Sequence, residues 1–278
     1  MRLRKQHILR LIAACCTAVI LVTIYHVIDT SPHSRLTRLM HLWSNKEKPI
    51  QPHEVTIVSL YNHVKHMEYV HALQNHEQYA RKHGYNWFHS LSGWSAGRHP
   101  AWSKIKLLQH LLSSTPDTRQ WFWMLDADAL IMNHTISVID AVLDEAARLF
   151  KEGDPDKKRV PDFILSKDCN AHNTGSFILR NSPWSMEFLD RVWNYNQTGV
   201  PYIDGWWENA VIHHMMEKES DYMNAHTQIV PQKLLNAYNS DCGYKYQPGD
   251  FVLHFPGLDK GTFFLLMKGL PGDESDRK

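Results

Sequence analysis

Residues 121–133 read Trp121-Phe-Trp-Met-Leu-Asp126-Ala-Asp128-Ala-Leu-Ile-Met-Asn133. The first five residues are all apolar, which is typical of a central strand buried on both faces of a parallel sheet. Two aspartates follow at once, two positions apart, and side chains at i and i+2 of an extended chain point to the same side. Open α/β sheets bind their ligands beyond the carboxyl ends of their strands. The segment therefore predicts a binding site at a strand end, with Asp126 and Asp128 converging on it.

The aspartate pair favours a bound cation. Two adjacent carboxylates repel each other unless a cation lies between them or one of them is protonated. Oxygen ligands select hard ions such as Mn²⁺ or Mg²⁺, and an ion held by few carboxylates usually completes its coordination with phosphate oxygens. This Asp-x-Asp (DXD) arrangement is typical of enzymes that use nucleotide-sugars. The alternative is a surface turn with two solvated aspartates, which the apolar strand directly before the pair makes less favourable.

Apolar, strand-like runs alternate with helical patterns from residue 54 onward, as in a layered α/β fold. Strands are expected at 55–61, 121–125, 163–166, 177–180 and 251–255, with a further extended piece beginning at 87. Helices are expected at 65–83, 102–112, 138–150, 183–195 and 207–216. Because neither repeats nor low-complexity stretches interrupt this pattern, the sequence predicts one globular domain over residues 54–278.

An uncharged apolar segment of 18 residues runs from Leu11 to Ile28, between Arg10 and Asp29. As a helix it would span roughly 27 Å, close to the ~30 Å hydrocarbon core of a bilayer. More Lys and Arg residues precede the segment than closely follow it, so the positive-inside rule leaves the N-terminus in the cytosol and the remainder in the lumen. The competing interpretation is a cleaved signal peptide. The length of the segment and the lack of a small-x-small cleavage pattern after it argue against that.

This topology divides the N-terminal part of the chain into three segments. Residues 1–10 form a cytosolic tail, residues 11–28 a transmembrane helix that acts as a signal-anchor, and residues 29–53 a stem. The stem is polar, contains three prolines and shows no sustained periodicity. We therefore expect a single-pass type II membrane protein whose globular domain is luminal.

The overall composition narrows the class of protein. The chain has 278 residues, of which 43% are hydrophobic and 21% charged, and its net charge of +1 argues against a nucleic-acid partner. Ten tryptophans and eleven tyrosines include rings that could stack on sugars, although core packing is their commoner fate. Cys169 and Cys242 could form a disulfide in an oxidising lumen or remain two buried thiols, and both possibilities stay open.

Several segments match a known family, in the same order along the chain. They are Tyr79-Ala-Arg-Lys-His-Gly-Tyr85, Trp102-Ser-Lys104-Ile, Trp123-Met-Leu-Asp126-Ala-Asp128-Ala-Leu-Ile-Met-Asn133, Asn173-Thr-Gly175-Ser-Phe-Ile-Leu-Arg180-Asn181, Pro231-Gln-Lys-Leu-Leu-Asn236-Ala-Tyr238 and Gly249-Asp250-Phe-Val-Leu-His254-Phe-Pro-Gly257. On these motifs the chain resembles glycosyltransferase family 34, the fungal galactosyl- and mannosyltransferases whose plant relatives include the xyloglucan xylosyltransferases. The segments span nearly the whole domain, and their collinearity is more specific than any single motif.

The resemblance implies a GT-A fold, a single α/β, Rossmann-like domain that binds a nucleotide-sugar and a metal. It also implies a retaining transfer of a hexose from UDP-galactose or GDP-mannose to a mannose-containing glycan or glycoprotein. Members of the family act in the Golgi membrane. The protein would then be an α-galactosyl- or α-mannosyltransferase.

Residue roles follow from the same resemblance. Asp126, Asp128 and His254 match the family's ligands for Mn²⁺ or Mg²⁺, whereas spacing alone would make His254 an ordinary core histidine. Glu208, with Asn209 beside it, matches the position beneath the anomeric carbon; by itself Glu208 would be a carboxylate at a helix N-terminus. The positions matched to donor binding are Lys104, Asp168, Asn170, Asn173, Gly175, Gly257 and Lys260. Departures from the family pattern occur at His172, Asn209, Leu258 and Asp259.

The implied mechanism is metal-assisted departure of the nucleotide diphosphate, with Lys104 and Lys260 as cationic support. No side chain stands out as a nucleophile, so attack from the face of departure is favoured, with Glu208 or Asn209 stabilising the positive charge at the anomeric centre. The candidate acceptor platform is aromatic and consists of Trp94, Trp102, Trp206 and Trp207.

Two other classes of protein fit parts of this pattern. A non-catalytic or partner-dependent subunit of a Golgi mannosyltransferase complex would keep the fold, and the departures leave room for it, but it has no physical need for Asp126, Asp128 and His254. A lectin-like module would need no nucleotide site. Metal-dependent binding of UDP or GDP, and donor hydrolysis by the purified protein alone, separate these classes from an enzyme.

Overall fold

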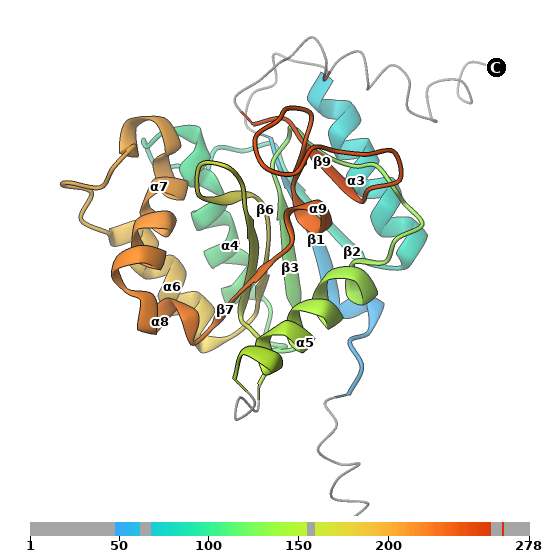
Figure 1. Cartoon of the computed structure of the whole chain (residues 1–278), viewed down its shortest axis with the longest axis horizontal. Helices are drawn as coiled ribbons and strands as arrows, with labels where there is room; N and C mark the ends of the chain where they lie inside the picture. Colours follow the sequence, from blue (N-terminus) through green and yellow to red (C-terminus); the bar gives the residue numbers. More distant parts are fainter. Residues whose placement is uncertain (1–47, 62–67, 155–158, 257–262, 264–278) are drawn as a thin grey trace, which may run out of the picture. The chain divides into compact units, whose positions relative to one another are not determined.

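The computed structural model describes residues 48–61, 68–154, 159–256 and 263, which are coloured in Figure 1. The predicted cytosolic tail, the anchor and most of the stem lie outside these ranges. Within them, no helix has the length and apolar character needed to cross a bilayer. By its internal contacts the chain divides after Pro49, and all the helices and strands named below belong to the second unit.

A six-stranded sheet forms the centre of this unit (Figure 1). Its order is β2 (Asn86–Ser90), β1 (Val55–Leu60), β3 (Trp121–Leu125), β6 (His172–Arg180), β5 (Phe163–Lys167) and β7 (Thr227–Val230). The pairs β1–β2, β1–β3 and β5–β7 are parallel, whereas β6 runs antiparallel to both of its neighbours. The α/β prediction is confirmed, but β3 lies in a mixed sheet and not in a wholly parallel one.

Helices cover both faces of this sheet, which explains why β3 carries no polar residue (Figure 1). One face packs on α4 (Ser103–Ser114), α6 (Pro183–Asn194) and α7 (Ile203–Lys218), and the other on α3 (Glu68–His83), η3 (Ile139–Leu143) and α5 (Asp144–Gly153). Successive side chains of a strand point to opposite faces. Phe122 and Met124 join the first cluster, and Trp121, Trp123 and Leu125 join the second.

A second, smaller sheet brings the C-terminal part of the chain to the end of β3. Its order is β4 (Ala129–Ile131), β9 (Val252–His254) and β8 (Ala237–Tyr238). β4 begins directly after Asp128 and pairs antiparallel with β9, so that Ala129 lies opposite His254. This register places His254 beside the two aspartates that the sequence singled out.

The remaining elements are short. They are η1 (Pro52–Glu54), η2 (Pro100–Trp102), α8 (Ser220–Asn224) and α9 (Gln232–Leu235). The sequence pattern did not predict β4, β7 or β8, whose two to four residues are too few to show periodicity. The predicted strand at 177–180 also begins too late in the sequence, because β6 begins at His172 and includes Asn173 to Gly175. The predicted helix at 138–150 opens with one π-helical turn, η3, before α5.

Candidate active site

A pocket of about 560 Å³ opens at the carboxyl end of β3. Its walls come from the turn after β3, the start of β6, the N-terminal part of α7 and the segment from β8 to β9. It is lined by all the predicted site residues that the structure describes: Lys104, Asp126, Asp128, Asp168, Asn170, Asn173, Gly175, Glu208, Asn209 and His254. Gly257 and Lys260, and the departures Leu258 and Asp259, lie outside the described residues.

The three predicted metal ligands meet at one edge of this pocket. Asp126, Asp128 and His254 each offer one ligand atom, and these atoms lie within 4.8 Å of one another. The Nε2 atom of His254 is 3.3 Å from Oδ1 of Asp128. Two carboxylates and an imidazole suit Mn²⁺ or a similar divalent ion. The donor set therefore fits the metal that the sequence analysis predicted.

Asn236 fixes the orientation of His254. Its Oδ1 lies 2.7 Å from Nδ1 of His254, and both side chains are buried. An amide oxygen only accepts hydrogen bonds, so Nδ1 carries the proton and the lone pair of Nε2 faces the aspartates. Histidines that bind metals are usually held in this way by a partner on the other ring nitrogen. Asn236 is therefore a positioning residue that the sequence analysis left without a role.

Gly175 gives His254 its space. A Cβ atom built on Gly175 would lie 2.1 Å from Cε1 of the His254 ring, a distance that no side chain tolerates. The carbonyl oxygen of Gly175 also accepts the backbone N–H of Asp126 at 2.8 Å. The family resemblance assigns this glycine to donor binding. In the structure, the group that approaches it is the imidazole of His254.

Lys104 is a buried link between two carboxylates. Its Nζ lies 2.8 Å from Oδ1 of Asp126 and 3.0 Å from Oε1 of Glu208, and it donates to the carbonyl of Thr174 at 3.1 Å. An ammonium group has three N–H donors, and these contacts occupy all of them. Burial alone would lower the pKa of Lys104, but the two carboxylates raise it above its usual value. The predicted contact with donor phosphates stays a prediction, because the geometry assigns Lys104 to holding Asp126 and Glu208.

Acidic groups outnumber the lysine at this edge of the pocket. Burial raises the pKa of Asp126, Lys104 partly offsets this, and the neighbouring Asp128 raises the pKa further. Burial likewise raises the pKa of Glu208, and Lys104 again opposes the change. A divalent cation beside Asp126 and Asp128 would relieve the repulsion between them.

Glu208 follows a break in α7. The preceding Trp207 has φ 48° and ψ −118°, a conformation that strains a bulky residue. Its ring is held against His99, with ring centroids 3.6 Å apart and planes at 4°. The break turns Glu208 inward, so that the residue is only 2% exposed and its Oε2 has no hydrogen-bond partner among the described residues. A buried oxygen without a partner is costly, and at the pocket wall it is available to a ligand.

The side-chain oxygen of Asn209 is occupied by hydrogen bonds within the protein. Its Oδ1 accepts hydrogen bonds from the backbone N–H of Thr174 at 2.9 Å and from the Thr174 hydroxyl at 2.8 Å. Both lone pairs of that oxygen are therefore used, and the contact joins α7 to β6. Of the two predicted catalytic candidates, Glu208 is the one whose oxygen remains available to face a developing positive charge.

Asp168 organises the turn between β5 and β6. Its Oδ1 accepts the backbone N–H groups of Asn170 and Ala171 at 2.7 and 2.9 Å. Its Oδ2 accepts from Nδ2 of Asn173 at 3.1 Å and from the hydroxyl of Tyr238 at 2.5 Å. Both carboxylate oxygens are thus occupied, and the turn forms a fixed wall of the pocket.

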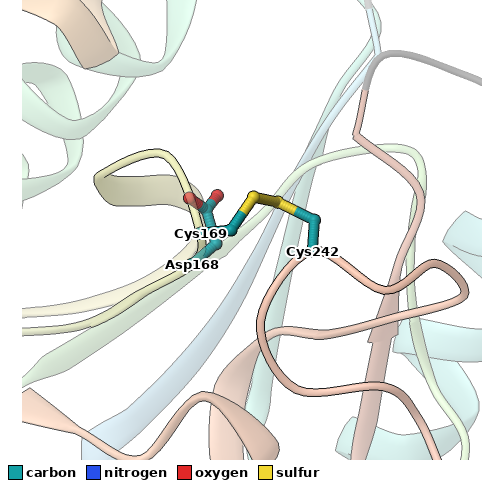
Figure 2. Close-up of side chains that lie close together, drawn as sticks. All are labelled: Asp168, Cys169 and Cys242. Carbon is teal, nitrogen blue, oxygen red and sulfur yellow. A yellow bond between two sulfur atoms is a disulfide. The ribbon is translucent and has the colours of Figure 1, made fainter.

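A disulfide between Cys169 and Cys242 ties this turn to the loop after β8 (Figure 2). The Cα atoms are 4.9 Å apart and 73 positions separate the two residues in sequence. The structure therefore decides between the two possibilities that the sequence left open. Asp168 lies beside the bond, but the two sulfurs are joined, so these three residues do not form a second metal site (Figure 2).

Of the predicted aromatic platform, only Trp206 and Trp207 line the pocket. Trp102 is buried in the core, and Trp94 packs against the same core and donates its Nε1–H to Ser90 Oγ at 2.9 Å. For these two tryptophans, core packing replaces the predicted role. His172 is one of the departures from the family pattern. Its Nδ1 atom lies 3.0 Å from Nδ1 of His213, and burial lowers the pKa of His172 to about 4.

Known proteins with similar sequences indicate the same class of protein as the residues that line the pocket. Residues 51–261 match the model of the galactosyl transferase GMA12/MNN10 family. An alpha-1,2-galactosyltransferase of Schizosaccharomyces pombe is 32% identical over 213 residues, which cover 67% of this chain and 55% of that protein. The probable alpha-1,6-mannosyltransferase MNN10 of Saccharomyces cerevisiae is 26% identical over 221 residues, covering 68% and 55%. The chain thus spans about half the length of these relatives.

Another relative comes from a plant, and a solved structure has a similar fold. Probable glycosyltransferase 3 of Oryza sativa subsp. indica is 28% identical over 204 residues, covering 67% of this chain and 42% of that protein. The crystal structure of a glycosyltransferase involved in the glycosylation of the major capsid of PBCV-1 superposes with a TM-score of 0.58 and 15% identity, covering 78% of this chain and 99% of that one. At this identity the likeness concerns the fold, which is of the GT-A type.

The family model covers most of the described domain, and its span contains the aspartate pair, Lys104, Glu208 and His254. The resemblance inferred from the collinear motifs is therefore confirmed, and the chain belongs to the galactosyl transferase GMA12/MNN10 family, glycosyltransferase family 34.

Proposed function

We propose that the protein is a retaining, metal-dependent glycosyltransferase that moves galactose or mannose from UDP-galactose or GDP-mannose to a mannose-containing glycan. The observation that carries the proposal is the meeting of Asp126, Asp128 and His254 at the end of a buried strand, beside a pocket. Relatives named as a galactosyltransferase and as a probable mannosyltransferase support the choice of hexose.

Asp126, Asp128 and His254 are the residues that would hold Mn²⁺ or Mg²⁺. The chemistry that such an ion would supply there is Lewis-acid stabilisation of the negative charge on the departing nucleotide diphosphate. Asn236 keeps the Nε2 lone pair of His254 directed at the site. Lys104 keeps Asp126 and Glu208 at fixed separation through its contacts to both carboxylates.

Glu208 supports the transfer step through its position. The anomeric carbon gains positive charge as the nucleotide departs, and a buried carboxylate stabilises such charge more strongly than one in water. We assign this stabilisation to Glu208, because both lone pairs of the Asn209 oxygen are occupied by Thr174. The bond between the anomeric carbon and the phosphate oxygen breaks, the acceptor hydroxyl attacks from the same face, and its proton passes to the departing phosphate, so that the configuration is retained.

Calorimetry with UDP and with GDP, each with and without Mn²⁺, tests the site directly. We expect one of the two nucleotides to bind tightly only when Mn²⁺ is present, because without a cation the negative diphosphate would face the carboxylates of Asp126 and Asp128. Equal binding with and without the metal would remove the metal-site proposal. Comparing UDP-galactose with GDP-mannose in the same assay identifies the donor.

The configuration of the product tests retention. We expect NMR of the product to show an α-linked hexose from the α-linked donor. A β-linked product would overturn the retaining mechanism and leave the metal site untouched. Release of the hexose from the donor by the purified chain alone distinguishes an enzyme from a subunit that requires a partner glycosyltransferase.

The membrane topology is a separate part of the proposal. Residues 11–28 would anchor the chain in the Golgi membrane as a single-pass type II protein, with the catalytic domain in the lumen. Protease treatment of intact and permeabilised vesicles from cells that make the full chain tests this. Digestion of the catalytic domain in intact vesicles would exclude a luminal orientation.

A further inference from the structure

Strained backbone gathers in two segments that contact each other, and one of its residues, Trp207, lines the pocket. Among the described residues, three that are not glycine have positive φ: Ala96 at 49°, Tyr202 at 60° and Trp207 at 48°. Such angles are uncommon for any side chain and outliers for bulky ones, and they persist where the surrounding structure enforces them, often at ligand sites. Residues 96–99 and 202–207 meet where His99 stacks on Trp207. The strain therefore lies in two segments that support each other.

Tyr202 presents an aromatic ring to solvent beside Trp206, a residue of the pocket wall. The residue is 66% exposed, and its ring stacks on Trp206 with centroids 4.5 Å apart and planes at 27°. Trp206 in turn packs against the hydrophobic core and lines the pocket. Core packing explains Trp206 but not the exposed Tyr202. The two rings form a supported aromatic surface that continues outward from the pocket.

The walls of the pocket differ in chemistry. Asp126, Asp128 and His254 suit a metal and a diphosphate. Residues 205–209 of α7 carry no cation, and Trp206 and Trp207 add two aromatic side chains to the lining. Glu208 follows these rings directly in sequence and contacts Lys104, which in turn contacts Asp126. A sugar on the aromatic part of the wall would therefore lie next to the reacting centre that we propose at Glu208.

We infer that Tyr202 and Trp206 form an acceptor subsite, on which a hexopyranose of the acceptor glycan lays the C–H face of its ring. This inference rests on the proposed transferase function and names how the acceptor is held. Pyranose rings carry C–H groups on one face that pack against aromatic faces, while their hydroxyls stay in water. Burial of apolar area and the electrostatics of the ring face both favour the contact.

Kinetics of Y202A and W206A test the subsite against two controls. Y202F keeps the ring, and L91A removes another exposed large apolar side chain, one that is not part of the pocket lining. We expect the KM for a methyl α-mannoside acceptor to rise about tenfold in Y202A and W206A, which corresponds to ~1.4 kcal/mol, and to remain at the wild-type value in Y202F and L91A. An acceptor KM in Y202A equal to that of L91A would overturn the inference.

Two further measurements keep the outcome decisive. If Y202A does not fold, Y202G removes the same ring and accommodates the positive φ without strain. If the wild-type chain neither transfers nor hydrolyses its donor, the proposed function fails, and NMR saturation transfer from protein to methyl α-mannoside or methyl α-galactoside still tests the subsite. A sugar signal present in wild type and Y202F and lost in Y202A supports the platform, whereas a signal unchanged in Y202A rejects it.

Discussion

The two ends of the central sheet hold their buried charges in opposite ways. At the amino end of β3, Asp162 is 1% exposed and fully paired, with Arg180 Nη2 at 2.5 Å and His226 Nδ1 at 2.5 Å. At the carboxyl end, Asp126, Asp128 and Glu208 lie near one ammonium among the described residues, that of Lys104, which contacts Asp126 and Glu208, while Asp128 lies beside His254. Matched charges stabilise a fold, whereas an excess of carboxylates needs a cation from outside. The difference identifies the carboxyl end as the site.

The largest effect is expected from Asp128→Ala. Loss of one proposed metal ligand should reduce sugar transfer about 10³-fold, because a bound metal would supply several kcal/mol of charge stabilisation. The free energy of unfolding should stay unchanged or rise, because one of two repelling carboxylates is gone. Initial rates with Mn²⁺ and urea unfolding measure the two effects. A sugar-transfer rate within threefold of wild type would contradict the proposal that the excess carboxylates at this end bind a cation.

Asp162→Ala should give the reverse result. Removing the acid leaves Arg180 partly buried without its partner, so the free energy of unfolding should fall by about 3 kcal/mol. The transfer rate per folded molecule should be retained, because Asp162 lies at the opposite end of the sheet from the pocket. Urea unfolding and rates at low temperature measure both. A selective loss of activity in this variant would break the contrast between the two ends.

A pH effect on stability is expected from His76, which holds α3 to β1 and β4. Its Nδ1 lies 2.8 Å from Ser59 Oγ and its Nε2 2.8 Å from the carbonyl of Ala129. Burial lowers its pKa to about 4. Below pH ~6.5 the unfolded chain binds a proton that the folded chain refuses, so the free energy of unfolding should fall as pH drops, by up to about 3 kcal/mol at pH 4. His76→Gln should remove this share of the pH dependence, and an unchanged slope would contradict it.

Gly175→Ala should disturb the proposed metal site by displacing the ring of His254. The added Cβ would lie 2.1 Å from the His254 ring, which must move. Affinity for Mn²⁺ should fall roughly 10- to 100-fold, and overpacking should cost about 1–3 kcal/mol of stability. Gly153→Ala is the matched control, since a Cβ there meets nothing within 4 Å. Equal Mn²⁺ affinity in the two variants, measured by calorimetry, would show that His254 is not a ligand.

The smallest effect is expected from Asn236→Ala. Without the Oδ1 acceptor, the His254 ring loses its fixed tautomer, and Mn²⁺ affinity should fall about tenfold. Asn236→Asp keeps an acceptor at the same place and should retain most of the affinity. Calorimetry with Mn²⁺ alone measures this without any need for substrate. A loss in Asn236→Asp as large as in Asn236→Ala would mean that the position matters for packing and not for the histidine.

Local patterns predicted those features that depend on neighbouring residues. The apolar run 121–125 and the aspartates after it could be read directly, because strand burial and the i, i+2 relation are properties of a short segment. The helix at 203–218 was found only in part, because Trp207 interrupts its dihedral angles. The edge strand β7 was missed, since four residues with mixed burial carry little periodic signal.

The residues of the candidate site likewise divide into those that the sequence predicts and those whose role only the fold reveals. The sequence alone identified Asp126 and Asp128 as a pair for a cation, because both lie on one short stretch and carry their chemistry with them. His254 entered only through the family motif, and the contacts of Asn236, Gly175 and Lys104 came from folding. Sheet register, disulfide pairing and ring stacking join segments far apart in the chain, and the free energy that selects them comes from burying those segments together. No local pattern contains that information, so the three-dimensional fold alone settles which carboxylates are paired within the protein and which are left in excess at the pocket.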